Sequence, residues 1–322
     1  MIRSLASASV WAAVLAAGCA ESAAAPEPQT APVSAHAPAI EQRPPNTTFE
    51  DVLAEYQALN QRLVRVAAPL RLANAELCPV TQRDPGFTVH RLEDYPRPVR
   101  PMAETLLGVK PGGIYVRAVR PGTSANEARI EPGDQILAVN ENAISADRLM
   151  QTYNRAVLRN GFDSVLSKVT IRTAGGQEFL ARIRPDTACN IPAKVVFSED
   201  INGHTDGQDV LITSALMRSV PDDTNLALVI AHEMAHVIAG HAGKLPTQEM
   251  ELEADRMALV LMARTGYDVD AAVHYWETAD HPHEGGSVAQ SSHPSTRARY
   301  ENFQSELERI RKFTSFETLD FD

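Results

Sequence analysis

The sequence has little positive charge, few aromatic residues and few cysteines. Its 30 Lys and Arg residues stand against 41 Asp and Glu residues, which gives a formal net charge of -11. Because an acidic protein repels phosphate backbones, we expect no nucleic-acid partner. The 322 residues are 44% hydrophobic and 22% charged, an ordinary globular composition with enough length for two or three domains.

Long hydrophobic runs are missing except at the N-terminus, where one follows Arg3. It is too short to span a bilayer comfortably, so we predict a secretory lipoprotein signal over residues 1–19. Its end, Leu15–Cys19, resembles a bacterial lipobox, which implies that Cys19 is lipidated and anchors the chain to a membrane. We therefore expect a lipoprotein on the periplasmic side of the bacterial cell envelope, favouring the outer membrane. The alternative is ordinary cleavage after Ala23–Ala25 and a soluble periplasmic protein.

Only three cysteines are present. Setting Cys19 aside leaves Cys78 and Cys189, an even pair in a chain that its signal sends to an oxidising compartment. We predict a disulfide between these two; the alternative is two separate buried thiols.

Residues 20–47 are rich in Ala and Pro and have hardly any large apolar side chains, so we expect a disordered tether. At Thr48 the character changes, because Thr48 and Asp51 have the spacing of a capping box and apolar residues then recur at helical spacing. The pattern predicts an N-terminal helix within 48–77, packed on the C-terminal domain. Residues 78–100 are expected to be a connecting segment.

The next 80 or so residues have β character with regular turns. Residues 114–119 and 135–139 have strand patterns, residues 145–159 a helical one, and 165–172 with 179–183 the pattern of a hairpin. The string from Gly133 to Asn140 resembles that of a bacterial PDZ domain. We therefore expect an inserted, β-rich PDZ-like domain over 101–187.

A PDZ fold implies a groove between a strand and a helix, where an extended peptide adds as a strand. Leu107, Gly108 and Val109 are the candidate loop for the peptide carboxylate. The expected ligands are C-terminal or unfolded peptides. The alternative is a module that only orders its neighbours.

Two histidines and a glutamate lie within a strongly apolar helical pattern over 225–239. His232 and His236 are at positions i and i+4, so both imidazoles reach one metal ion, and Glu233 can reach a water molecule bound to that ion. Burying these three polar groups costs several kcal/mol unless they are paired or bind metal. The pattern predicts a zinc site.

Catalytic zinc takes three protein ligands and keeps one position for water. A second predicted helix, 247–264, carries Glu251 and Asp255 at i and i+4. This spacing lets Glu251 ligate while Asp255 accepts a hydrogen bond from a ligating imidazole, and Glu253 is expected to be solvated. The competing third ligands are His241, Glu249, His281, His283 and His293.

Three blocks of the C-terminal part resemble the HtpX-like, BepA-like and CAAX prenyl protease-like zinc metallopeptidases of the gluzincin group. These blocks are residues 231–236, residues 251–255, and residues 292–296 followed by Arg299. The resemblance implies a mainly helical zincin-type domain with a small sheet over 188–322, and an α+β fold overall. It also implies one zinc per chain and a role for each residue: zinc ligands His232, His236 and Glu251; general base Glu233; ligand support by Asp255; a catalytic place near the metal for His293; and cleft support by Arg299.

These features together predict a zinc-dependent endopeptidase that acts on envelope or misfolded polypeptides. Alternatives are a PDZ-containing envelope chaperone or adaptor with a latent site, and a zinc hydrolase of non-peptide substrates. Residues 209–213 are expected to form a strand, either at the cleft edge or in the core. Residues 278–292 are either a lid or a plain connection.

Overall fold

The computed structural model describes residues 47–278, 295–313 and 319–321. In these ranges the chain combines helices and strands, in keeping with the expected α+β class. None of the helices there is long and apolar enough to cross a lipid bilayer. The predicted signal, the tether and Cys19 lie outside the described residues.

Helix α1 (Phe49–Ala73) begins at the predicted capping box. The Thr48 hydroxyl accepts a hydrogen bond from the Asp51 N–H at 3.2 Å, and the Asp51 carboxylate accepts one from the Thr48 N–H at 2.8 Å. Two N–H groups that the first turn leaves without helical partners are therefore satisfied.

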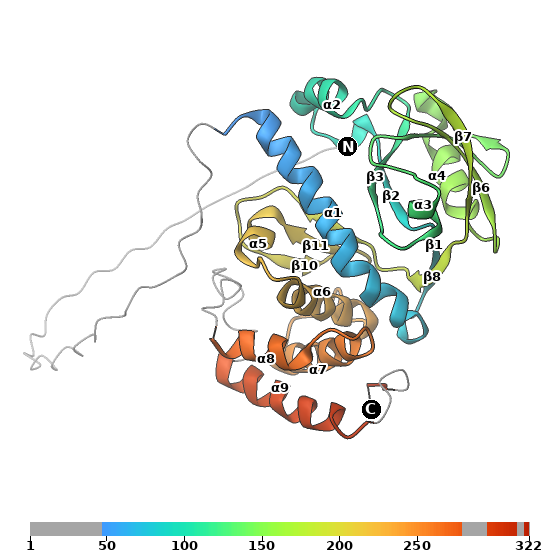
Figure 1. The fold of residues 1–322 in the computed structure, drawn as a ribbon. Helices are drawn as coiled ribbons and strands as arrows, with labels where there is room; N and C mark the ends of the chain where they lie inside the picture. The colour runs from blue at the N-terminus through green and yellow to red at the C-terminus, as the bar shows by residue number, and fades with distance from the viewer. Residues whose placement is uncertain (1–46, 279–294, 314–318, 322) are drawn as a thin grey trace, which may run out of the picture. The chain divides into compact units, whose positions relative to one another are not determined.

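A six-stranded antiparallel sheet forms the PDZ-like segment, in the order β2-β3-β4-β6-β7 with β5 paired to β4 (Figure 1). Its inward side chains and those of the neighbouring helices make a separate hydrophobic core, in which Phe87 and Phe162 pack edge to face. The elements are β2 (Phe87–His90), α2 (Arg100–Leu107), β3 (Ile114–Val119), α3 (Ser124–Glu127), β4 (Gln135–Val139), β5 (Asn142–Ala143), α4 (Gln151–Asn160), β6 (Ser167–Arg172) and β7 (Glu178–Ile183).

The PDZ-like sheet begins earlier than the sequence suggested. Strand β2 lies within residues 78–100, which we expected to be only a connection, yet it pairs with β3 along its length. This strand has only four residues and lies between Pro85 and Pro96, so it is too short for an alternating pattern to be recognised.

The helix expected from residue 145 begins later. Asp147 accepts a hydrogen bond from the Leu149 N–H at 2.9 Å, and a short 3-10 turn precedes α4, which starts only at Gln151. The hydrogen bond from the Leu149 N–H to Asp147 favours a turn over an α-helix at this point. The spacing of apolar residues does not reveal such local capping.

The two ends of the PDZ-like segment meet at its base. Strand β1 (Thr81–Asp84) pairs antiparallel with β8 (Asp186–Cys189), so that Thr81 lies opposite Cys189. The predicted disulfide between Cys78 and Cys189 is present, with the two Cα atoms 5.6 Å apart. The covalent bridge and the paired strands together close the segment.

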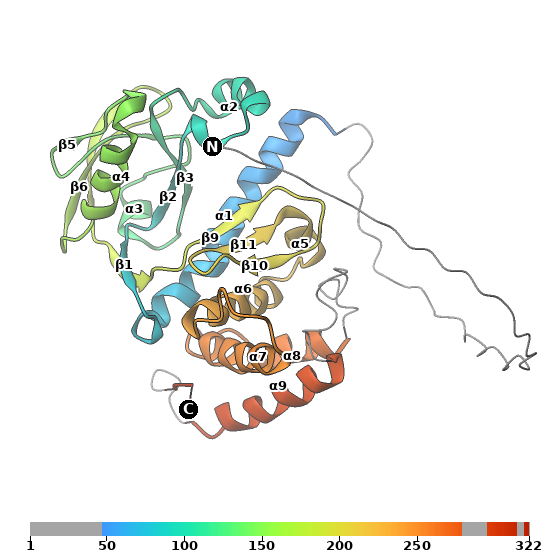
Figure 2. The same cartoon turned by 180° about the vertical axis from the view of Figure 1, so that it is seen from behind.

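In the described residues of the C-terminal part, a three-stranded sheet is accompanied by helices α5 to α9 (Figure 2). The middle strand β11 runs parallel to β9 and antiparallel to β10. Of the two expectations for residues 209–213, the structure supports the core strand, because β11 has a neighbour on each side. The elements are β9 (Ala193–Val196), β10 (Gly203–Thr205), β11 (Val210–Thr213), α5 (Ser214–Ser219), α6 (Asp223–Ile238), α7 (Gln248–Ala263), α8 (Val269–Thr278) and α9 (Thr296–Ile310).

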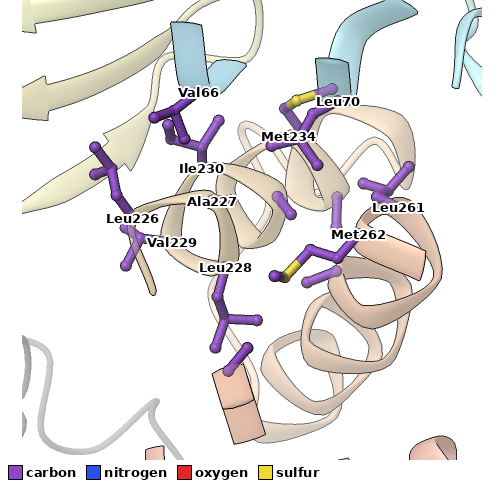
Figure 3. Close-up of a cluster of buried hydrophobic side chains, with 14 of the residues drawn as sticks. Val66, Leu70, Leu226, Ala227, Leu228, Val229, Ile230, Met234, Leu261 and Met262 are labelled. Carbon is purple, nitrogen blue, oxygen red and sulfur yellow. The ribbon is translucent and has the colours of Figure 1, made fainter. Parts of the chain in front are cut away.

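Helix α6 is apolar on nearly every face and is buried accordingly. Its side chains pack against α1 and α7, and the helix also contacts strands β10 and β11. Figure 3 shows Val66 and Leu70 of α1 near Ile230 and Met234 of α6, in the same cluster as Met262 of α7. This packing fixes the helix that carries both histidines.

Helix α1 is hydrogen-bonded to both parts of the chain. The Gln61 side chain bonds both backbone groups of Val119 at the end of β3, at 2.7 and 3.3 Å. One residue further on, Arg62 donates to the Met217 and Val220 carbonyls, each at 2.7 Å. The helix therefore joins the PDZ-like sheet to the C-terminal part.

We expect the disulfide to contribute substantially to stability, because it closes a loop of 111 residues. Replacing both Cys78 and Cys189 by Ser should lower the free energy of unfolding by about 2 to 5 kcal/mol. Urea unfolding followed by circular dichroism measures the change, and reduced wild-type protein should unfold like the double variant. Identical unfolding of oxidised and reduced wild type would contradict this expectation.

Candidate metal centre and active site

Helix α6 brings two imidazoles to one point. His232 and His236 lie one helical turn apart, and their Nε2 atoms are 3.1 Å from each other. The Asp222 side chain caps the helix by accepting hydrogen bonds from the N–H groups of Thr224 and Asn225. Both histidine side chains are only 13% exposed, so their environment is mostly protein.

Helix α7 adds a buried carboxylate to this pair. Glu251 Oε2 lies 3.4 Å from His232 Nε2, and its Oε1 lies 3.6 Å from His236 Nε2. One potential ligand atom from each of the three residues falls within 4.8 Å of the others. Of the competing third ligands, His241 and Glu249 are not part of this group, and His281, His283 and His293 lie outside the described residues.

Asp255 and Arg299 support the His232 side of the centre. Asp255 Oδ1 lies 2.9 Å from His232 Nδ1, and the Arg299 guanidinium from α9 contacts both Asp255 oxygens, at 2.8 and 2.5 Å. The Asp255 side chain is 1% exposed and that of Arg299 5%. Burial opposes ionisation of Asp255, but Arg299 and His232 outweigh it and hold the pKa of this carboxyl below its usual value.

His236 has a different neighbour. His241, just beyond the end of α6, places its Nδ1 2.9 Å from His236 Nδ1, and its Nε2 lies 3.3 Å from Glu253 Oε2 on α7. We expected Glu253 to be solvated, and its side chain is indeed 47% exposed, but it also contacts His241. Helical spacing does not reveal this contact, because His241 follows a helix end where Gly240 has φ +64°.

The pKa values of the two imidazoles are shifted in opposite directions. Burial disfavours charge on His232, but the carboxylates of Asp255 and Glu251 outweigh it and raise its pKa from 6.5 to about 9. Burial and the neighbouring His232 charge lower the pKa of His236 to about 3. At neutral pH the metal-free pair therefore carries one positive charge.

Glu233 is half-buried beside His232 and lies close to strand β10. A Cβ built on Gly203 of β10 would lie 3.2 Å from Val229 and 3.9 Å from Glu233 Cγ. Because Gly203 has no side chain, the strand backbone approaches α6 at the turn that carries Glu233. The Glu233 side chain thus lies next to β10, a strand at the edge of the sheet.

The donor set fits zinc. Two imidazole nitrogens and one carboxylate are a recognised set for catalytic zinc. The Nδ1 atoms of both histidines face acceptors away from the three-residue group, which leaves Nε2 free to ligate. A buried Glu251 beside two imidazoles also needs a compensating positive charge, which either a metal ion or a proton supplies.

The structure does not place the expected carboxylate loop at a free strand edge. Leu107, Gly108 and Val109 lie between α2 and β3, and β3 already pairs with β2 and β4. Val109 is fully buried in a small cluster that also contains Leu53 of α1. This segment therefore lacks the exposed edge to which a peptide strand would add.

We expect Arg299 to be essential for stability, because without it Asp255 is a buried charge facing only His232. Replacing Arg299 by Met should lower the free energy of unfolding by about 3 to 5 kcal/mol. The matched control is Arg297→Met on the same helix, because the Arg297 side chain is 87% exposed and its loss should leave the free energy of unfolding nearly unchanged. Chemical unfolding measures both variants, and equal effects would contradict the assignment.

We also expect the metal-free protein to show a raised pKa for His232 and a lowered pKa for His236. Because the pKa of His232 is raised, its contribution to stability is complete below pH 6.5 and is lost as the pH rises through about 9. His236 acts in the opposite direction: its contribution is present above pH 6.5 and is lost as the pH falls towards about 3. Heteronuclear NMR of labelled imidazoles should find both midpoints, and two ordinary midpoints near 6.5 would refute the charge distribution.

Comparison with known proteins agrees with this geometry. The profile of "Peptidase family M48" matches residues 194–247 and 245–307, and the profile of "PDZ domain" matches residues 81–156. The PDZ match includes β2, in agreement with the structure rather than with the boundary expected at residue 101. No curated protein matches the chain significantly.

Among solved structures, the crystal structure of the HtrA3 PDZ domain bound to a phage-derived ligand is similar to this chain. It is 23% identical, and the match covers 34% of this chain and 89% of that domain, with a TM-score of 0.25. The first profile spans β10, β11 and every element that supplies the ligand group. Residues 194–307 of the chain therefore form a domain of peptidase family M48, a family of metallopeptidases, and residues 81–156 match a PDZ domain.

Proposed function

We propose that this protein is a zinc-dependent endopeptidase that hydrolyses peptide bonds in polypeptides, with Glu233 as the general base. The observation that carries the proposal is the convergence of His232, His236 and Glu251 within 4.8 Å, beside Glu233 on the same helix.

Zinc held by these three side chains would supply Lewis acidity and lower the pKa of a bound water towards 7. The protein's own side chains transfer protons and orient the ligands. Glu233 takes the proton of the attacking water and later gives it to the leaving amine. Asp255 and His241 keep the two imidazoles oriented, so that the Nε2 atoms face the ligand group. We also propose His293, for which the family resemblance implies a position near the metal, as a second donor to the oxyanion.

Strand β10 is the proposed substrate edge. Within the described residues β10 pairs with β11 alone, and it approaches Glu233 at Gly203. An extended substrate strand added to the other side of β10 would bring a backbone carbonyl close to the centre. Residues 209–213, for which the sequence left this role open, include β11, which has a neighbouring strand on each side.

The PDZ domain is proposed to bind peptide segments and bring them to the peptidase. Its edge strand β2, rather than the segment of Leu107, Gly108 and Val109, offers the free edge that peptide addition needs. An adaptor with a latent site is less well supported, because Glu233 and all three ligand residues are present. Unfolded and misfolded envelope proteins are the proposed substrates.

We further propose that the chain works in the bacterial cell envelope, on the periplasmic side, tethered to the outer membrane through a lipid on Cys19. The lipobox-like sequence ending at Cys19 supports this location. The Cys78–Cys189 disulfide supports it too, because disulfides persist mainly in oxidising compartments.

The test compares wild type with Glu233→Gln in the mature protein. Both should hold one zinc per chain by elemental analysis, while casein cleavage by the variant should fall by about 100-fold or more. The exposed Glu249→Gln, on helix α7, is the control and should cleave normally. Wild type should also lose activity to a chelator and regain it with zinc. Undiminished cleavage by Glu233→Gln would contradict the assigned base, and wild type without zinc would contradict the centre.

A further inference from the structure

We infer that His241 and Glu253 form a positioning pair that fixes the orientation and tautomer of His236, as Asp255 does for His232. This inference rests on the proposed function, because it assumes that His236 ligates zinc through Nε2. It assigns a role to two residues that lie outside the ligand group.

The end of α6 places His241 against the metal-facing histidine. The helix closes at Gly240, whose positive φ of 64° suits glycine, and the His241 N–H then donates to the His236 carbonyl at 2.9 Å. The His236 and His241 rings lie 5.1 Å apart between centroids, inclined by 67°. His241 is only 7% exposed, so its ring is held by protein.

The hydrogen bonds permit one consistent proton arrangement. An imidazole that ligates through Nε2 carries its proton on Nδ1, so His236 Nδ1 donates to His241 Nδ1 across 2.9 Å. His241 must then accept at Nδ1, which places its own proton on Nε2. That proton faces Glu253 Oε2 at 3.3 Å, and a carboxylate is an acceptor.

Both ring nitrogens of His241 are therefore engaged in hydrogen bonds, so this residue is not a metal ligand. It cannot offer a lone pair to the metal while Nδ1 accepts from His236 and Nε2 donates to Glu253. Its exclusion from the three-residue group agrees with this account. His241 is therefore a positioning residue.

The two sides of the centre are supported differently. His232 meets the Asp255 carboxylate directly, and that side chain is 1% exposed. His236 meets a neutral imidazole, with the 47% exposed Glu253 one step further out. Since water can partly replace an exposed carboxylate, we expect loss of His241 to matter more than loss of Glu253.

The experiment measures zinc dissociation constants by competition with a chromophoric chelator. His241→Leu removes the acceptor and should weaken zinc binding by about 10- to 100-fold. His241→Asn restores an amide oxygen near the position of Nδ1 and should recover most of the affinity. Glu253→Leu should weaken binding by about tenfold or less, and the control Glu249→Gln should leave it unchanged. Circular dichroism checks that every variant is folded.

Two results would overturn the inference. One is a folded His241→Leu with wild-type zinc affinity, and the other is an equal loss in His241→Leu and His241→Asn, which would mean that ring packing matters rather than the hydrogen bond. The absorption spectrum of the cobalt-substituted protein adds a readout of ligand geometry. This spectrum should change in His241→Leu and return to that of wild type in His241→Asn. If wild type itself bound no zinc, the proposed function would fail, whereas normal zinc binding by wild type and His241→Leu alike would overturn only this inference.

Discussion

The burial of charged and polar side chains between α6 and α7 is the constraint on which the rest of the structure depends. Two imidazoles from α6 face Glu251 and Asp255 from α7, and these carboxylates are 5% and 1% exposed. Buried carboxylates are stable only when positive charge compensates them, so α9 supplies Arg299 to Asp255. The apolar packing around α6 is therefore accompanied by buried ion pairs of Asp255 with Arg299 and His232.

The remainder of the chain holds this arrangement in place. Helix α1 packs on α6 while its Gln61 and Arg62 side chains bond the PDZ sheet and the C-terminal part respectively. The disulfide and the β1–β8 pair bring the two ends of the PDZ-like segment together at its base. A peptide bound by the PDZ domain would thus be attached to the scaffold that carries the candidate metal centre.

Sequence reasoning found the elements whose signals are local and periodic. The spacing of His232, Glu233 and His236 and the all-round apolar pattern of α6 were sufficient to place that helix, and the capping box placed α1. Contacts between distant segments were harder to predict. Strand β2 was too short to recognise. The Glu253–His241 contact joins α7 to the segment that follows α6, which helical spacing alone does not predict. The position of β10 at the edge of the sheet follows only from the order of the strands.

The central claim is that His232, His236 and Glu251 together hold one zinc ion. Anomalous diffraction at the zinc absorption edge, from crystals of the mature protein, tests it most directly. The account predicts a single strong peak about 2.0 to 2.2 Å from both Nε2 atoms and from a Glu251 oxygen. A peak at other residues, or none in zinc-supplemented crystals, would contradict it.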